Sequence, residues 1–173
     1  MQRVLITGAA GFIGSAIART LLNSDRAVEV IGVDNMNDYY SPTLKQANLS
    51  SFLEDPRFTF VQDSLEYMPN ECLAEIVNSC DTIFHQAGQP GVRASWGSDF
   101  NEYLSRNILA TQKILEFAKN SCQRDTRVVY ASSSSVYGDQ PSYPVDEDAL
   151  PRPNSPYGVS KLAAEHLCSL YAR

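Results

Sequence analysis

The sequence predicts an α/β domain built on a doubly wound parallel sheet. Short runs rich in Val, Ile and Phe alternate along the chain with longer stretches of helical period, which is the pattern of consecutive βαβ units. A glycine-rich turn, TGAAGFIG at residues 7–14, joins the first run to the first helical stretch. Asp34 ends the second run about twenty residues after that turn. Together these observations are typical of a sheet that binds a ligand at the carboxyl ends of its strands.

The first two strand and helix pairs have the clearest patterns. Arg3–Thr7 (RVLIT) is the apolar run of a buried strand, and Phe12–Leu22 has the period of a helix. The apolar face of this helix is predicted to consist of Ile13, Ile17, Leu21 and Leu22. Val28–Val33 is expected to form the second strand, and Ser41–Leu53 the second helix.

The rest of the chain repeats the alternation of strands and helices. The further strands expected are Phe58–Val61, Thr82–His85 and Val128–Ser132. The further helices expected are Pro69–Asn78, Phe100–Lys119 and Tyr157–Tyr171. A loop rich in Gly, Pro and Ser precedes the second of these helices, and a polar, proline-rich segment precedes the third. A complete sheet of order 3-2-1-4-5-6 would need at least one more strand than these five.

The composition indicates one globular domain, residues 1–173. The chain has 20 acidic and 14 basic side chains, a net charge of -6 and 43% hydrophobic residues. This acidic balance argues against nucleic acid or an anionic membrane as the main partner, because both require a basic surface. No run reaches the roughly 18 apolar residues of a membrane span, and no secretory signal is visible, so a cytoplasmic protein is expected. The four cysteines and two histidines give no zinc pattern, and no metal site is predicted.

The glycine-rich turn predicts a phosphate-binding loop. Without Cβ atoms, the chain can turn tightly at Gly8, admit a diphosphate near Gly11 and pack its helix closely at Gly14. Asp34 can accept hydrogen bonds from adenosine ribose hydroxyls and would repel a 2′-phosphate, so NAD is favoured over NADP. Asp63, after the third strand, can accept a hydrogen bond from the adenine amino group. Glycines and strand-end aspartates also occur in plain turns, so the combination is stronger evidence than any single residue.

A second pattern predicts an acid–base site. Tyr157 and Lys161 lie four residues apart at the start of the last helix, so both side chains point from one face. A free tyrosine, with a pKa of about 10, is a poor general base at neutral pH. An adjacent ammonium and the positive nicotinamide of NAD⁺ favour its phenolate. A serine run, in YASSSSVYG at residues 130–138, ends the preceding strand. One of its hydroxyls can bond a substrate oxygen; Ser133 is favoured, with Ser135 assisting.

In combination these motifs resemble a known superfamily. The segments TGAAGFIG, HQAGQPGVRAS (85–95) and YASSSSVYG, with Tyr157 and Lys161, are similar to the extended short-chain dehydrogenase/reductase superfamily and its NAD-dependent epimerase/dehydratase family. The sequence looks most like UDP-glucose and UDP-glucuronate 4-epimerases, and GVDNMNDYY (32–40) favours the glucuronate enzymes. The resemblance covers essentially the whole chain and implies a Rossmann-type NAD-binding domain.

The resemblance also implies roles for individual residues. The catalytic set would be Ser133, Tyr157 and Lys161. Contacts to NAD would come from Gly8, Gly11, Phe12, Ile13, Gly14, Asp34, Asn35, Asp63, Ser64, Ala87, Asn107 and Lys161. Contacts to substrate would come from Arg93, Ser133 and Ser135. Related dehydratases carry acidic residues after the first catalytic hydroxyl, where this chain has Ser134 and Ser135, so dehydration and decarboxylation are disfavoured.

The expected function is NAD-dependent 4-epimerisation of a nucleotide sugar, either a UDP-hexose or a UDP-hexuronate. The sugar would be oxidised transiently at C4, and the hydride would return to the other face. Family members continue with further strands and a substrate lobe, which residues 1–173 are expected to lack. An NAD-binding module without full catalysis is therefore one alternative, and a sugar dehydratase or reductase is another. Family dimers pair through two long helices, here Phe100–Lys119 and Tyr157–Tyr171, so the resemblance also allows a homodimer.

Overall fold

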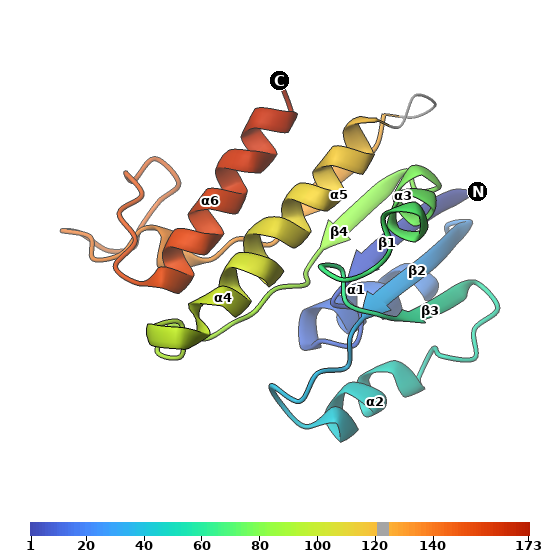
Figure 1. The fold of residues 1–173 in the computed structure, drawn as a ribbon. Coiled ribbons are helices and arrows are strands. Elements are labelled where there is room, and N and C mark those ends of the chain that lie inside the picture. Colours follow the sequence, from blue (N-terminus) through green and yellow to red (C-terminus); the bar gives the residue numbers. More distant parts are fainter. Residues whose placement is uncertain (121–124) are drawn as a thin grey trace.

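The computed structural model describes residues 1–120 and 125–173. Within these ranges the strands form one all-parallel sheet in the order β3-β2-β1-β4-β5 (Figure 1). The strands are β1 (Gln2–Thr7), β2 (Val28–Asp34), β3 (Phe58–Gln62), β4 (Thr82–His85) and β5 (Arg127–Tyr130). Strands β2 and β3 lie on one side of β1, and β4 and β5 lie on its other side, as in a doubly wound fold. The predicted fold class is therefore confirmed.

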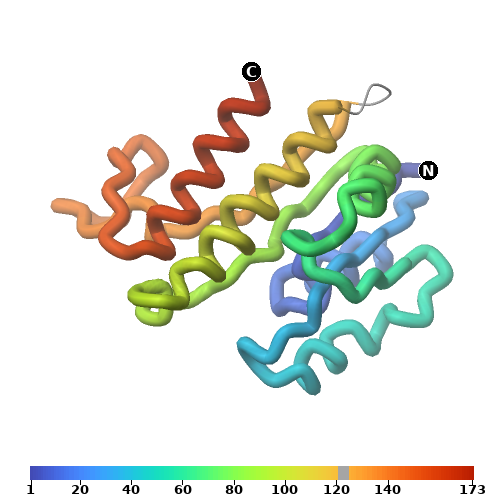
Figure 2. Tube along the Cα trace, in the orientation of Figure 1, coloured from blue at the N-terminus to red at the C-terminus, as the bar shows by residue number. Residues whose placement is uncertain are grey.

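Helices connect the strands and pack against both faces of the sheet. They are α1 (Phe12–Leu22), α2 (Pro42–Ser50), α3 (Asn70–Asn78), α4 (Phe100–Tyr103), α5 (Ala110–Lys119) and α6 (Pro156–Tyr171). Figures 1 and 2 show α5 and α6 side by side, running in the same direction. Helix α6 begins at a clear N-terminal cap: the Ser155 hydroxyl accepts a hydrogen bond from the backbone N–H of Gly158, and Pro156 occupies the first turn.

Two apolar clusters cover the two faces of the sheet. Along β1 the side chains alternate, so that Val4 and Ile6 pack with α1 and α2, whereas Leu5 packs with α3 and α5. The first cluster consists of Val4, Ile6, Ala9, Ala10, Ala18, Leu22, Val28, Val30, Leu49, Phe52 and Phe58. The second consists of Leu5, Val33, Leu65, Met68, Leu73, Val77, Cys80, Ile83, Ala110 and Ile114. Burial of these side chains is the main favourable contribution to folding.

Helix α1 has the predicted bounds, but its buried face is only partly the predicted one: Leu22 is buried as predicted, and smaller residues take the centre of the contact. Gly14 and Ala18 are buried against the sheet, whereas Ile13 is 58% exposed. Ile17 and Leu21 are only partly buried at the edge of the first cluster. Small side chains let the helix axis approach the sheet closely, so the larger residues are turned away from the centre of the contact.

The predicted helix Phe100–Lys119 contains a π-helical segment that periodicity did not reveal. Helix α4 leads into this segment, Leu104–Leu109, and α5 continues from it. The wide turn includes Asn107, which is almost fully buried. Single π-turns within α-helices are frequent at functional sites.

The fifth strand ends before the predicted bound of Ser132. Its last pair in the sheet joins Tyr130 to His85, the final residue of β4, and the N–H of Ala131 makes one further bond to the His85 carbonyl oxygen (3.1 Å). Residues 134–136 then form a short 3-10 helix. The serine run therefore leaves the sheet and lies in the loop at its carboxyl edge.

Candidate active site

A cavity of about 430 Å³ opens at the carboxyl ends of β1, β2, β3 and β4. It lies where the strand order reverses, which is the usual ligand site of a doubly wound sheet. The predicted cofactor contacts that line it are Gly8, Gly11, Phe12, Ile13, Gly14, Asp34, Asn35, Asp63, Ser64, Ala87 and Lys161. Tyr157 also lines the cavity, whereas Asn107, Arg93, Ser133 and Ser135 do not.

Two glycines of the turn are required by its geometry. Gly8 has a φ of +69°, a left-handed conformation that favours glycine, and a Cβ there would lie 2.9 Å from the backbone nitrogen of Ala87. A Cβ on Gly14 would collide with the carbonyl oxygen of Gly8. These close approaches hold the amino end of α1 at the cavity, where its unpaired N–H groups can face an anion.

The carboxylate of Asp34 is held firmly at the end of β2. One of its oxygens accepts a hydrogen bond from the backbone N–H of Ala10 (3.1 Å), and the other accepts one from the N–H of Met36 (2.8 Å). The residue is only 7% exposed, yet it lines the cavity. Asp34 is thus positioned to meet a polar group of a ligand that enters from the cavity.

Lys45, on α2, is a site residue that the sequence reading missed. Its Nζ atom lies 3.2 Å from Asp34 Oδ1 and 3.1 Å from Asn37 Oδ1, and the side chain is nearly buried in the cavity wall. A signal was present in the sequence, because Lys45 precedes Leu49 by four residues and shares the buried face of its helix. A lysine on an apolar face points to a buried partner.

Asn107 holds the loop after β4 from behind the cavity wall. Its amide oxygen accepts a hydrogen bond from the N–H of Gln89 (2.6 Å), and its amide nitrogen donates to the Gln89 carbonyl (3.1 Å) and to Ser160 Oγ (2.9 Å). Arg106, one residue earlier, lines the cavity and donates to Gln89 Oε1 (2.6 Å). The π-helical turn thus places one side chain behind the loop and the next in the cavity.

His85 belongs to the structural support of the site. Burial lowers the pKa of His85 to about 3, so its ring is neutral at neutral pH. The Thr111 hydroxyl donates to the carbonyl of Asn107, so it accepts from His85 Nε2 (2.9 Å). His85 Nδ1 then accepts from the Thr7 hydroxyl (2.7 Å), which in turn accepts from the N–H of Ala87 (3.1 Å). This chain of bonds connects the ends of β1 and β4 to the π-helical turn.

Tyr157 and Lys161 face the same cavity from the first turns of α6. Lys161 is 6% exposed, and burial lowers its pKa to about 8. Its Nζ atom lies 4.4 Å from the ring centroid of Tyr130. Burial strongly raises the pKa of Tyr130, so that phenol stays neutral. Of these two tyrosines, only Tyr157 lines the cavity.

The ring of Tyr157 is braced by the buried Tyr103. Their ring centroids lie 6.2 Å apart in an edge-to-face arrangement. The Tyr103 hydroxyl is in turn 2.8 Å from the carbonyl oxygen of Gly91 and 3.0 Å from that of Pro90. These contacts tie the orientation of Tyr157 to the loop after β4.

The serine run lies next to α6, although only one of its hydroxyl residues lines the cavity. That residue is Ser132, whereas Ser133 caps the 3-10 helix by accepting from the N–H of Ser135 (3.2 Å). A Cβ on Gly158 would lie 2.5 Å from the carbonyl oxygen of Ser135, so the first turn of α6 packs directly on this run. Arg93 is exposed and lies outside the cavity lining. The catalytic and substrate roles of Ser133, Ser135 and Arg93 stay predictions.

Residues 4–173 match the family described as the NAD dependent epimerase/dehydratase family. The chain belongs to this family. The match covers nearly the whole chain and agrees with the resemblance carried by the glycine turn, the serine run and the pair of Tyr157 and Lys161.

Similar proteins include epimerases and a dehydratase. An uncharacterized UDP-glucose epimerase of Bacillus subtilis (strain 168), YtcB, is 43% identical over 173 residues, covering 98% of this chain and 52% of the relative. A UDP-glucuronic acid 4-epimerase from Bacillus cereus, solved in complex with UDP-glucuronic acid and NAD, has a TM-score of 0.90 and 42% identity, covering 98% of this chain and 52% of that one. DesIV, a dTDP-glucose 4,6-dehydratase from Streptomyces venezuelae solved with NAD bound, has a TM-score of 0.87 and 32% identity, covering 99% and 52%.

The chain spans about half the length of the curated relatives it matches. In residues 1–120 and 125–173, no helix combines the length and apolar character needed to cross a membrane.

The buried Lys161 is expected to make stability depend on pH. Its pKa is about 8 in the folded chain against 10.5 ordinarily, so between these values the unfolded chain binds a proton that the folded chain has lost. From pH 8 to pH 10, the free energy of unfolding should therefore rise by about 2 kcal/mol more in the wild type than in a Lys161→Met variant. Urea denaturation at a series of pH values measures this difference. Parallel profiles for the two proteins would contradict the burial of a titrating lysine.

Proposed function

We propose that the chain carries the NAD-binding and proton-transfer residues of an NAD-dependent nucleotide-sugar 4-epimerase that acts on a UDP-hexose or UDP-hexuronate. One observation carries this proposal: a single cavity joins the glycine turn and Asp34 to Tyr157 and Lys161. A dinucleotide needs an anion site for its diphosphate and a polar partner for its ribose, and the cavity lining offers both. The similar structure from Bacillus cereus holds UDP-glucuronic acid and NAD, which supports this cofactor and substrate class.

Proton transfer is assigned to Tyr157. When bound, NAD⁺ would accept the hydride from C4 of the sugar and return it to the opposite face. The Tyr157 phenolate takes the proton of the 4-hydroxyl group and gives it back when C4 is reduced. Lys161 favours this phenolate by its charge, and with a pKa of about 8 it is mainly an ammonium at neutral pH. Ser133 is proposed to donate a hydrogen bond to the 4-oxygen.

Epimerisation is favoured over dehydration by the serine run. The similarity to DesIV shows that the same fold also occurs in a dehydratase. Dehydration requires an additional acid or base to remove water from the sugar, and the resemblance places acidic residues after the first catalytic hydroxyl in such enzymes. This chain has Ser134 and Ser135 there, and neither carries a carboxyl group.

The proposal is tested by following sugar interconversion without added NADH. The chain is joined at its carboxyl end to the C-terminal half of the Bacillus cereus UDP-glucuronic acid 4-epimerase. This fusion is expected to interconvert UDP-glucuronate with UDP-galacturonate, or UDP-glucose with UDP-galactose, and chromatography of the nucleotide sugars measures the products. Formation of a 4-keto-6-deoxy sugar instead would favour a dehydratase. A fusion that binds NAD but turns over none of these sugars would favour the alternative of an NAD-binding module.

The chain is expected to bind NAD at least about tenfold more tightly than NADP, because the Asp34 carboxylate would face the 2′-phosphate of NADP. Isothermal calorimetry of the purified chain with each cofactor measures the two Kd values. Equal or tighter binding of NADP would contradict the assignment of Asp34 to the ribose.

A homodimer through α5 and α6 is part of the proposal. Leu109, just before α5, is 48% exposed, and Leu170, near the end of α6, is 62% exposed. Exposed apolar side chains on neighbouring helices support a contact with a second copy. Native mass spectrometry should show a species of twice the chain mass of 19.1 kDa, whereas monomer alone would contradict the dimer. A cytoplasmic location and a role in carbohydrate metabolism stay predictions.

A further inference from the structure

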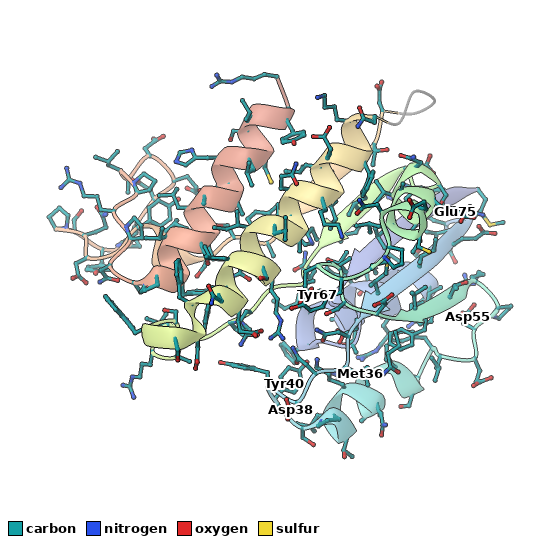
Figure 3. The ribbon with its side chains drawn as sticks, viewed as in Figure 1. Met36, Asp38, Tyr40, Asp55, Tyr67 and Glu75 are labelled. Carbon is teal, nitrogen blue, oxygen red and sulfur yellow. The ribbon has the colours of Figure 1, made fainter. Side chains whose placement is uncertain are left out.

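Lys45 and Asp34 form a buried ion pair in the wall of the cavity. Both side chains are 6% exposed, and their charged atoms lie 3.2 Å apart. Lys45 Nζ also lies 5.2 Å from the ring centroid of Tyr40. In Figure 3, Met36, Asp38 and Tyr40 mark the segment that runs from β2 toward α2, the two elements that supply the pair. Helix packing therefore delivers a cation to the same place as the strand-end carboxylate.

Hydrogen-bond accounting shows what this pair can still offer a ligand. A carboxylate has about four acceptor positions. Asp34 uses three of them, for Ala10, Met36 and Lys45. The Lys45 ammonium has three N–H groups, of which two are directed at Asp34 Oδ1 and Asn37 Oδ1. One acceptor position and one N–H group thus remain for a ligand in the cavity.

Stability alone is a poor explanation for this arrangement. A buried ion pair loses the hydration of both charges, and replacing such a pair by apolar side chains is often neutral or stabilising. Here both members line a cavity rather than the interior of a core cluster. Their position at the cavity indicates a role in binding.

We propose that Lys45 is a cofactor-specificity residue that binds the adenosine ribose together with Asp34. This inference rests on the proposed binding of NAD. Asp34 accepts a hydrogen bond from one ribose hydroxyl, and Lys45 donates one to the oxygen of the other. Lys45 also offsets part of the charge of Asp34, so it sets how strongly a 2′-phosphate is rejected. Discrimination between NAD and NADP then depends on the balance of two opposite charges, not on the carboxylate alone.

The test is a set of binding measurements by isothermal calorimetry with NAD and with NADP. In an Asp34→Asn variant, Lys45 loses its anionic partner and becomes free to pair with the 2′-phosphate, so NADP should bind about tenfold more tightly than to the wild type. Adding Lys45→Met to that variant should remove this gain and weaken NADP binding by about tenfold or more. NAD should lose only a few-fold from the second substitution, since one hydrogen bond is removed.

The comparison between the single Asp34→Asn variant and the double variant avoids a buried, unpaired carboxylate. The single variant does leave the buried Lys45 ammonium without its anionic partner, so thermal unfolding of each variant accompanies the Kd measurements, which are made only on folded protein. Lys119→Met is the matched control, because Lys119 also pairs with a carboxylate, Glu116, and lies over a tyrosine ring, Tyr171, but does not line the cavity. This control should leave both Kd values unchanged.

Two failures can be told apart. Equal NADP affinity of the single and double variants, with normal NAD binding by the wild type, would overturn the role of Lys45 alone. A wild-type chain that binds neither cofactor would overturn the proposed function and this inference together.

Discussion

Replacing Tyr157 by Phe is expected to lower 4-epimerase turnover of the completed fusion by about 10²–10⁴-fold. The phenylalanine ring retains the edge-to-face contact with Tyr103, but the oxygen that moves the proton of the 4-hydroxyl group is lost. NAD binding should change little, because the rest of the cavity lining is unaltered. Turnover is measured by chromatography of the nucleotide sugars under saturating substrate.

A matched substitution makes this result specific. Tyr67→Phe removes the hydroxyl of a tyrosine that is 77% exposed and does not line the cavity, so it should leave turnover unchanged. Robust turnover by the Tyr157→Phe fusion would exclude Tyr157 as the proton-transfer residue. The 173-residue chain by itself should show little or no turnover, and efficient turnover by it would show that no further lobe is needed.

A Gly11→Val substitution is expected to weaken NAD binding by about two orders of magnitude or more while the chain stays folded. Gly11 has a φ of -71°, which any residue adopts, so the backbone tolerates a side chain. A Cβ there would lie 3.0 Å from the carbonyl oxygen of Gly8 and 3.5 Å from the Tyr40 hydroxyl, which requires only a small local shift. The valine methyl groups would occupy the space of the diphosphate at the amino end of α1. Calorimetry with NAD and thermal unfolding measure the two effects.

Gly14→Ala provides the contrast. At this position a Cβ would collide with the Gly8 backbone inside the packed turn, so the expected loss is in stability. Near-normal NAD affinity in a folded Gly11→Val variant would show that the diphosphate does not approach this glycine. Loss of folding in that variant, with Gly14→Ala still stable, would reverse the roles given to the two positions.

The fold class followed from the sequence because it depends on local patterns. Strand and helix periods, and the glycines that end one element and open the next, are properties of a few consecutive residues. Parallel strands also bring their carboxyl ends to one edge, so the meeting of Gly8, Asp34 and Asp63 at one cavity could be expected from their places in the chain. The four-residue spacing of Tyr157 and Lys161 likewise ensured that both would face the same way.

Other features were decided only when distant segments packed together. Lys45 is a site residue because Leu49, on the same face of α2, packs into the first core cluster. This packing places the Lys45 ammonium beside the carboxylate of Asp34, which lies eleven positions earlier at the end of β2. The sequence predicts a cofactor contact for Asn107, and that contact stays a prediction; the structure adds that its side chain bonds the Gln89 backbone from a π-helical turn, which helical periodicity does not predict. Ser132 lines the cavity because the pairing of β5 with β4 ends at Tyr130, so the serine run lies in the loop beyond the sheet. Burial and pairing of polar groups depend on neighbours far away in sequence, and local periodicity holds no information about those neighbours.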